Sequence, residues 1–296
     1  MRIAHVTDIH VLVPPSPGQL LSKRLLGSTN LYLFGRRSHF TDAVQRSLVE
    51  GVMEQAPDAL LCTGDLTAQA TDQEFQAAFE LLAPLFDRQP TALIPGNHDT
   101  YTRKAWKGAR IEERFGRWTG EGRWPRVHLL GDGVGAVAVD TCRASLNSAG
   151  VVDDAQLDRL GAALEDPRLE GRFVFVMMHY PLRNRRGEPY GPSRRALREA
   201  RAVERVLGAH AGRVGAIVHG HEHHGFRTRL PDDLGGLTIL DPGASGYAWL
   251  PEKKRTAHFN IYTVEDQQLT DVERFRFDGE VGRFLPEPGG AYASGG

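Results

Sequence analysis

Cysteine is scarce in this sequence of 296 residues: it occurs twice, as Cys62 and Cys142, each close to the end of an apolar run. We interpret both as small buried side chains in a reducing compartment, so no disulfides are expected. Long apolar runs are also missing, because the densest one, Phe173 to Met178, is far too short to cross a bilayer. Met1 to Asp8 begins a strand pattern and lacks the apolar core of a signal peptide. These absences predict a cytoplasmic protein.

A surplus of one charge sign is absent too. The formal net charge is -1, which excludes the whole-chain basic surplus of a dedicated nucleic-acid binder. Hydrophobic residues make up 41% and charged residues 25% of the chain, as in a globular protein. The length allows one large α/β domain or two small ones, with a sizeable core. Partners must therefore be inferred from local motifs.

The first third of the chain alternates between predicted strands and helices. Strands are predicted at Arg2 to Thr7, Asp58 to Thr63 and Thr91 to Ile94. Apolar residues at helical spacing predict helices over 39–55 and 71–86. This βαβαβ order favours a parallel sheet with crossover helices.

The rest of the chain predicts a mixed set of elements. Val127 to Leu130 and Val134 to Asp140 form a predicted hairpin, and 103–115 and 153–164 form predicted helices. Buried strands are predicted at 173–178 and 214–218, with a helix before the second that runs to His210. The last predicted strands form a meander, at 226–230, 237–240, 256–264 and 270–277.

We expect one domain over residues 1–278, followed by a mobile Gly/Pro-rich tail over 279–296. Two segments read as lid-like insertions. Residues 14–37 are rich in Pro, Gly and basic residues, and residues 183–201 are rich in arginine.

Five apolar runs each end in polar side chains that can bind metal or transfer protons. These residues are Asp8, His10, Asp65, Asn97, His98, His179, His221 and His223. Each alone is a weak signal, since a solitary His or a Gly-Asp pair is usually structural. The carboxyl ends of parallel strands converge at one sheet edge, so the ordered set predicts a shared site.

The order of these motifs resembles the calcineurin-like metallophosphoesterases. Their spacing is similar to the class III cyclic-nucleotide phosphodiesterase branch of that family. The motifs are Asp8-x-His10, Gly64-Asp65, Gly96-Asn97-His98-Asp99, His179 and Gly220-His221-x-His223. The resemblance implies a four-layer α/β/β/α sandwich of two mixed sheets with the metals at its edge.

The resemblance also implies roles for these residues. Asp8, His10 and His223 hold one metal, Asn97, His179 and His221 hold the second, and Asp65 bridges both. Carboxylate, amide and imidazole ligands without thiolate suit Mn, Fe, Zn, Ni or Co ions. Two divalent or trivalent ions roughly 3.5 to 4 Å apart can hold a hydroxide that attacks phosphorus.

His98 is expected to protonate the leaving group as a general acid. Asp99 is a second catalytic candidate, because its carboxylate can accept the other ring N–H of His98 and keep that ring protonated. The alternative is that Asp99 only stabilises the turn, as Asp often does. Asp140, at another strand end, can orient a ligand or act as a plain cap.

The arginines between Arg183 and Arg201 can clamp a phosphate, and we assign Arg185 and Arg186 as substrate-binding residues. The alternative is a solvated basic face. Tyr180 stands where many relatives carry a second His, which leaves the substrate contacts open. The substrate choice is expected to depend on residues 14–37 and on Tyr247 to Trp249.

The predicted function is a binuclear metal-dependent phosphodiesterase acting on a cyclic nucleotide or a related small phosphoester. The same site supports a phosphomonoesterase or a nucleotide or lipid pyrophosphohydrolase. Leucines and basic residues in 14–37 would suit a lipid surface, although a helix packed on the core is the simpler account. The alternative outside enzyme functions is a catalytically silent interaction scaffold. The sequence does not predict the oligomeric state.

Overall fold

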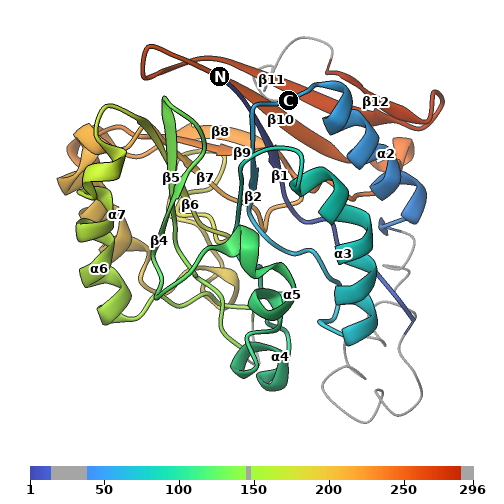
Figure 1. Cartoon of the computed structure of the whole chain (residues 1–296), viewed down its shortest axis with the longest axis horizontal. Coiled ribbons are helices and arrows are strands. Elements are labelled where there is room, and N and C mark those ends of the chain that lie inside the picture. The colour runs from blue at the N-terminus through green and yellow to red at the C-terminus, as the bar shows by residue number, and fades with distance from the viewer. Residues whose placement is uncertain (15–38, 145–147, 288–296) are drawn as a thin grey trace.

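Two six-stranded sheets lie face to face in the computed structural model, which describes residues 1–14, 39–144 and 148–287 (Figure 1). The first sheet has the order β12-β11-β10-β1-β2-β3 and the second has the order β4-β5-β6-β7-β9-β8. The predicted lid over 14–37 falls, apart from Pro14, outside the described residues.

The first sheet confirms the βαβαβ prediction. Its strands are β1 (Arg2–Val6), β2 (Ala59–Cys62), β3 (Thr91–Leu93), β10 (His258–Glu265), β11 (Gln268–Asp278) and β12 (Arg283–Pro286). β1 pairs in parallel with β2, and β2 with β3. β10 and β11 add antiparallel strands on the other side of β1, so the sheet is mixed.

The second sheet is mixed as well. Its strands are β4 (Arg126–Leu129), β5 (Val134–Ala138), β6 (Phe173–Met177), β7 (Ala216–Val218), β8 (Phe226–Arg229) and β9 (Thr238–Asp241). β4 and β5 form the predicted hairpin, and β5, β6, β7 and β9 run parallel to one another. The carboxyl ends of β6 and β7 therefore lie at one edge.

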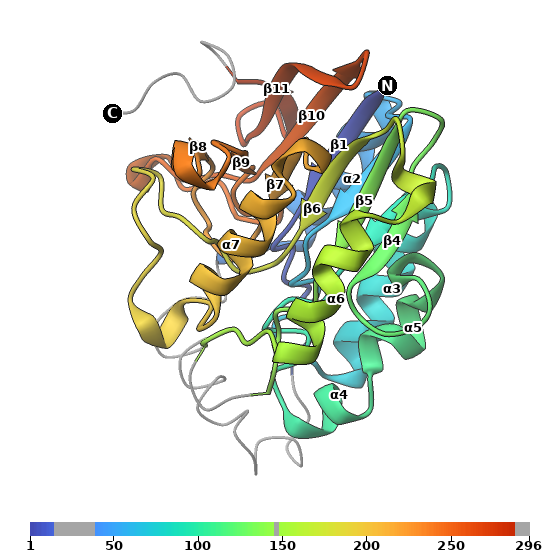
Figure 2. The same ribbon diagram turned by 90° about the vertical axis from the view of Figure 1, so that its left-hand side faces the viewer.

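Helices cover the outer face of each sheet. α2 (Asp42–Glu54), α3 (Asp72–Phe86), α4 (Arg103–Lys107) and α5 (Arg110–Thr119) lie on the side of the first sheet, and α6 (Asp154–Leu164) and α7 (Ala200–Ala209) lie on the second (Figures 1 and 2). Three apolar cores fill the spaces between the four layers. The middle core joins the sheets, with Ile3 and Leu61 from one and Phe175 from the other. The predicted four-layer sandwich is confirmed.

The start of α3 shows how the sequence defines its helices. The Thr71 side chain accepts from the Glu74 N–H, and the Glu74 carboxylate accepts from the Thr71 N–H, which is a capping box. Phe75, Leu82 and Phe86 then recur on one face and are buried against the first sheet.

Two predictions about helices and strands were wrong. The single helix predicted over 103–115 is broken, because Ala109 adopts a left-handed conformation with φ 45° between α4 and α5. The four late strands do not form one meander: β8 and β9 join the second sheet, and the chain then crosses to β10 and β11 in the first. Apolar alternation cannot tell which of two sheets a strand joins.

Arg283–Pro286, which lie within the predicted Gly/Pro-rich tail, form strand β12. β12 pairs antiparallel with β11, and Phe284 is buried against Phe259 and Phe277. Hydrophobic burial of this ring holds a segment that its glycines and prolines suggested was mobile. Among the described residues, no helix is long and apolar enough to cross a membrane.

Candidate metal centre

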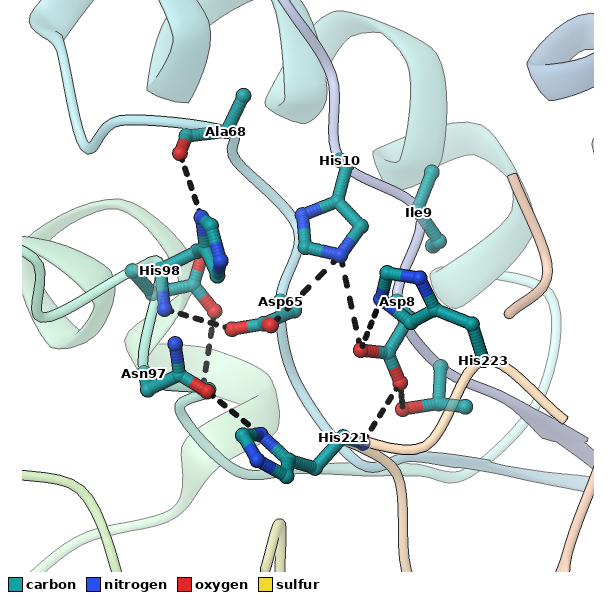
Figure 3. A network of polar contacts seen from close by, with 12 residues as sticks. Asp8, Ile9, His10, Asp65, Ala68, Asn97, His98, His221 and His223 are labelled. Atoms are coloured by element: carbon teal, nitrogen blue, oxygen red, sulfur yellow. Dashed lines mark hydrogen bonds and ion pairs between the residues drawn. The ribbon is translucent and has the colours of Figure 1, made fainter. Parts of the chain in front are cut away.

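The eight polar residues at the strand ends converge, and they come from both sheets; Figure 3 labels all of them except His179. The segments after β1, β2 and β3 supply Asp8, His10, Asp65, Asn97 and His98, and those after β6 and β7 supply His179, His221 and His223. Strand patterning alone suggested one edge of a parallel sheet, whereas the family resemblance implied the edge of a two-sheet sandwich, and the second prediction agrees with the structure. The site lies where the aligned edges of two packed sheets meet.

One group consists of Asp8, His10 and His223. The Nε2 atoms of both histidines lie 3.6 Å from Asp8 Oδ1. The candidate ligand atoms of all three residues lie within 4.8 Å of one another, so a single ion can touch each of them. The His223 side chain keeps 32% of its surface exposed, and this group is therefore open to solvent on that side.

A second group surrounds the amide of Asn97. Its Oδ1 lies 3.0 Å from His179 Nε2 and 2.8 Å from His221 Nδ1. Asp65 stands between the two groups, because its Oδ2 is 3.4 Å from His179 Nε2 and 3.7 Å from His10 Nε2. The sequence-based ligand set is thus brought together with Asp65 in the middle.

The site has the ligand types of a metal site, and several of its buried ligand atoms lack hydrogen-bond partners. Asp8 Oδ1, His10 Nε2 and His221 Nε2 are buried, and none has a hydrogen-bond partner among the described residues. Buried polar atoms without partners are costly, whereas coordination to a cation would satisfy them. Imidazole, carboxylate and amide oxygen suit first-row transition ions. The residues therefore fit the two metal ions that the sequence implied.

Four of the candidate ligands hold their backbone in the left-handed region. The φ angles are 50° for Asp8, 52° for His10, 56° for Asp65 and 71° for His221. Non-glycine residues adopt this conformation at a cost in free energy, and such residues cluster at functional sites. At these residues the backbone turns sharply after each strand, and the turn directs the ligand side chains into the site.

Two glycines make room for this crowding. A Cβ atom on Gly96 would lie 2.1 Å from Asp65 Oδ1, and one on Gly220 would lie 2.0 Å from Thr7 Oγ1. Any side chain at either position would displace a candidate ligand or the residue that supports it.

Hydrogen bonds orient the ligands from behind. His179 Nδ1 lies 2.8 Å from the Thr63 carbonyl oxygen, so Nδ1 carries the proton and Nε2 faces Asp65 and Asn97. Asp8 Oδ2 accepts from Thr7 Oγ1 at 2.8 Å and from the His221 N–H at 2.9 Å. These contacts leave Asp8 Oδ1 free for a cation. Sequence reasoning missed Thr7 and Thr63, which carry no signal beyond their position beside the ligands.

The carboxylates favour positive charge at this place. Burial by itself lowers the pKa of His179, but the carboxylates of Asp65 and Asp8 and the Thr63 carbonyl together outweigh burial and raise that pKa to about 9. A position where buried carboxylates stabilise a protonated imidazole is also one where they stabilise a metal cation.

His98 lies beside the metal groups, but its partner is not Asp99. His98 Nδ1 lies 2.6 Å from the Ala68 carbonyl oxygen. The Asp99 carboxylate instead accepts from the N–H groups of Gly96, Leu66 and Thr67 at 2.9 to 3.2 Å. The predicted contact between Asp99 and the His98 ring was therefore wrong. Asp99 fixes the turn, because unpaired N–H groups in this buried loop need an acceptor.

The imidazole of His98 also lies in a group with His10 and Asp65 whose candidate ligand atoms are within 4.8 Å of one another. Burial lowers the pKa of His98, and the Asp65 carboxylate opposes that shift. The sequence assigned His98 away from the metals, and the geometry places it close to His10 and to Asp65.

Aromatic rings cover the first group. The Phe40 ring centroid lies 4.4 Å from that of His10 and 5.7 Å from that of His223, and the Tyr247 ring lies 5.9 Å from His223. Sequence reasoning noted Tyr247 as a determinant of substrate choice but missed Phe40, which precedes a helix and carries no metal-binding signal. The rings pack against His10 and His223 and leave part of the His223 side chain exposed.

The arginine segment divides into two kinds of residue. Arg183 is buried and pairs with Glu204, with Nε 2.5 Å from Oε1 and Nη2 2.8 Å from Oε2. Arg185 and Arg186 are exposed and line a cavity of about 450 Å³ with Tyr190 and Glu222. Sequence reasoning missed Glu222, whose only signal is its place between His221 and His223.

Two further candidates have structural surroundings. Asp140 accepts from the Cys142 N–H at 2.9 Å and from Arg143. These contacts agree with the alternative in which Asp140 only caps the strand end. Tyr180 is buried with its ring 4.5 Å from the His221 ring, where it packs beside a candidate ligand. Both cysteines are buried and unpaired, and burial raises the pKa of each thiol.

Two packed sheets with a histidine and carboxylate site at their shared edge define the class of metal-dependent phosphoester hydrolases. The sequence profile of the calcineurin-like phosphoesterases matches residues 1–225, and the chain belongs to that family. A probable cyclic nucleotide phosphodiesterase of Pseudoalteromonas sp. (strain SM9913) is 24% identical to it over 282 residues, 92% of this chain and 91% of that protein.

Solved structures show the same fold. A dimetal phosphatase from Danio rerio aligns with a TM-score of 0.61 at 13% identity, over 93% of this chain and 94% of that one. A purple acid phosphatase from yellow lupin (Lupinus luteus) seeds aligns with a TM-score of 0.59 at 12% identity, over 96% of this chain and 52% of that one.

Proposed function

We propose that this protein is a binuclear metal-dependent phosphodiesterase that acts on small-molecule phosphodiesters. The observation that carries the proposal is the position of Asp65 between two groups of candidate ligands that contain buried atoms without partners. Asp8, His10 and His223 would hold one ion, and Asn97, His179 and His221 would hold the other. The ligand types suit Mn, Fe, Zn, Ni or Co.

Two bound ions would supply Lewis acidity to the phosphoryl oxygens and lower the pKa of a bound water. The chain supplies orientation and proton transfer. The Thr63 carbonyl and the Asp8 contacts hold the ligands in one geometry. His98 Nδ1 donates to Ala68, so the ring acts as an acid when Nε2 is protonated as well, and the proton on Nε2 would go to the departing alkoxide.

The preference for diesters rests on one relative. The protein from Pseudoalteromonas is named a probable cyclic nucleotide phosphodiesterase. A proton donor at His98 serves any ester with a poor leaving group, in a diester or an alkyl monoester. A phosphomonoesterase, or a nucleotide or lipid pyrophosphohydrolase, would use the same ligands and is the second candidate.

A substrate panel tests the proposal. It contains cyclic nucleotides, bis-p-nitrophenyl phosphate, p-nitrophenyl phosphate and glycerophosphodiesters, each assayed with added Mn²⁺. We expect the diesters to have the higher kcat/KM and Asp65→Asn to abolish turnover. Faster hydrolysis of the monoester would favour the second candidate. No hydrolysis at all would favour a silent scaffold, although such a scaffold is expected to lose a ligand and all seven are present.

A further inference from the structure

The cavity beside the metal centre is lined by residues of two loops, which are joined by the hydrogen bond from Tyr190 to Glu222. Residues 184–191 form one wall, and residues 222–226, which continue directly from the ligand His221, form the other. The Tyr190 ring centroid lies 6.1 Å from that of His221, and Glu222 separates the two ligands His221 and His223 in the chain. The cavity therefore opens next to the place where phosphorus would react. Its volume of about 450 Å³ is within the range of small-molecule sites.

The arginine wall is held in place from inside the protein. The buried bidentate pair between Arg183 and Glu204 anchors the base of the loop. At the tip, Asn184 Oδ1 accepts from the N–H groups of Arg186 and Glu188 at 2.8 and 3.2 Å, and Gly187 has φ 77°. A turn of this kind fixes the backbone, so Arg185 and Arg186 leave it from a defined position.

The acidic side chains of the cavity already have hydrogen-bond donors. The Tyr190 hydroxyl donates to Glu222, and Asn184 Nδ2 donates to Glu188 Oε2 at 3.0 Å. Arg255 Nη2 donates to His224 Nε2 at 2.7 Å, so this ring nitrogen is already engaged as an acceptor.

The two arginines have no such partners. Among the described residues, no carboxylate lies within 4.0 Å of the guanidinium of Arg185 or Arg186, and neither guanidinium donates a hydrogen bond. The donors of the cavity are thus free while its carboxylates are occupied. A phosphate suits two such guanidinium groups, because its oxygens can accept two parallel N–H bonds from each arginine.

We propose that this cavity is a subsite for a second phosphate group, carried by one of the two groups esterified to the reacting phosphate. The inference rests on the proposed phosphodiesterase function and narrows its substrate class to esters with an additional phosphoryl charge. Arg185 and Arg186 bind that phosphate, and the occupied Glu222 faces the part of the substrate between the two phosphorus atoms.

Two esters that differ by one phosphate test this directly. They are the p-nitrophenyl ester of thymidine 5′-phosphate and the same ester with a 3′-phosphate, both assayed with Mn²⁺. We expect the ester with the 3′-phosphate to have the higher kcat/KM, through a lower KM. The preference is measured as its kcat/KM divided by that of the ester without the 3′-phosphate. Arg185→Ala and Arg186→Ala are each expected to reduce this ratio by roughly tenfold, as for loss of a charge-assisted hydrogen bond. Arg185→Lys should retain part of the preference.

Arg213→Ala is the matched control, because Arg213 is exposed and precedes β7, at the opposite end of that strand from the site. Its ratio should equal that of the unchanged protein. A ratio near one in the unchanged protein, or equal losses in all the Ala variants, would overturn the subsite.

Calorimetric binding of thymidine 3′,5′-bisphosphate and thymidine 5′-phosphate separates the subsite from the reaction. Absence of hydrolysis of either ester would defeat the proposed function. The subsite would then stand only if the bisphosphate binds tighter and Arg185→Ala removes the difference, and it would fall if both ligands bind equally.

Discussion

The Nδ1 atom of His98 lies 2.6 Å from the carbonyl oxygen of Ala68. A carbonyl oxygen only accepts, so Nδ1 carries a proton in every protonation state of the ring. Proton exchange therefore takes place at Nε2. The backbone of a neighbouring loop, and not a carboxylate, sets the tautomer of the proposed general acid.

Replacement of His98 by Ala should remove the proton donor and leave the metal ligands in place. We expect kcat for esters with alkoxide leaving groups to fall by about 10²- to 10⁴-fold. p-Nitrophenyl esters should lose much less, because p-nitrophenolate leaves without protonation. Steady-state rates on both classes, with metal content measured in parallel, check this. Equal losses on both classes would contradict the acid role.

Replacement of Asp99 by Ala should act on stability. The change leaves the buried N–H groups of Gly96, Leu66 and Thr67 without their acceptor. We expect the free energy of unfolding to fall by about 2 to 4 kcal/mol. Asp87→Ala, which removes an exposed pair with Arg117, is the control and should cost less than about 1 kcal/mol. Urea unfolding measures both, and similar losses would show that Asp99 does not hold the turn.

Glu74 should make stability depend on pH. Its carboxylate accepts from the N–H groups of Gln69 and Thr71, yet burial raises its pKa from 4.5 to about 7. A raised pKa means that the folded state favours the protonated acid. This contribution is complete below pH 4.5 and is lost as pH rises through 7, which amounts to about 3 kcal/mol.

Glu74→Gln keeps an acceptor oxygen but cannot ionise. The stability of the variant relative to the unchanged protein should therefore rise between pH 4.5 and 8. Urea unfolding at several pH values measures the difference. A difference that stays constant with pH would show that Glu74 ionises as easily in the folded state as in the unfolded chain.

The residues that the sequence singled out at strand ends do lie together, whereas their surroundings were harder to predict. Asp8, Asp65 and His179 each follow an apolar run, and the end of a buried strand is a position that local patterning shows. The packing of β6 against β1 across two sheets is a long-range event, which local patterning does not show. Periodicity also could not reveal the left-handed Ala109 that separates α4 from α5.

Side-chain partners were the least predictable feature. Asp99 follows His98 in the chain, and this adjacency suggested a contact. The turn instead directs the carboxylate to three backbone N–H groups. The bond from Tyr190 to Glu222 joins residues 32 apart in the chain, and neither residue type signals it. Such contacts depend on loop conformation, which composition and spacing do not determine.

Metal stoichiometry tests the central claim most directly. Elemental analysis of the purified protein, repeated after chelation and reloading with Mn²⁺, should give two ions per chain together with restored hydrolysis of bis-p-nitrophenyl phosphate. Asp65→Asn should lower both values, because Asp65 lies between the two groups. A protein that binds no metal and gains no activity from Mn²⁺ would contradict the account.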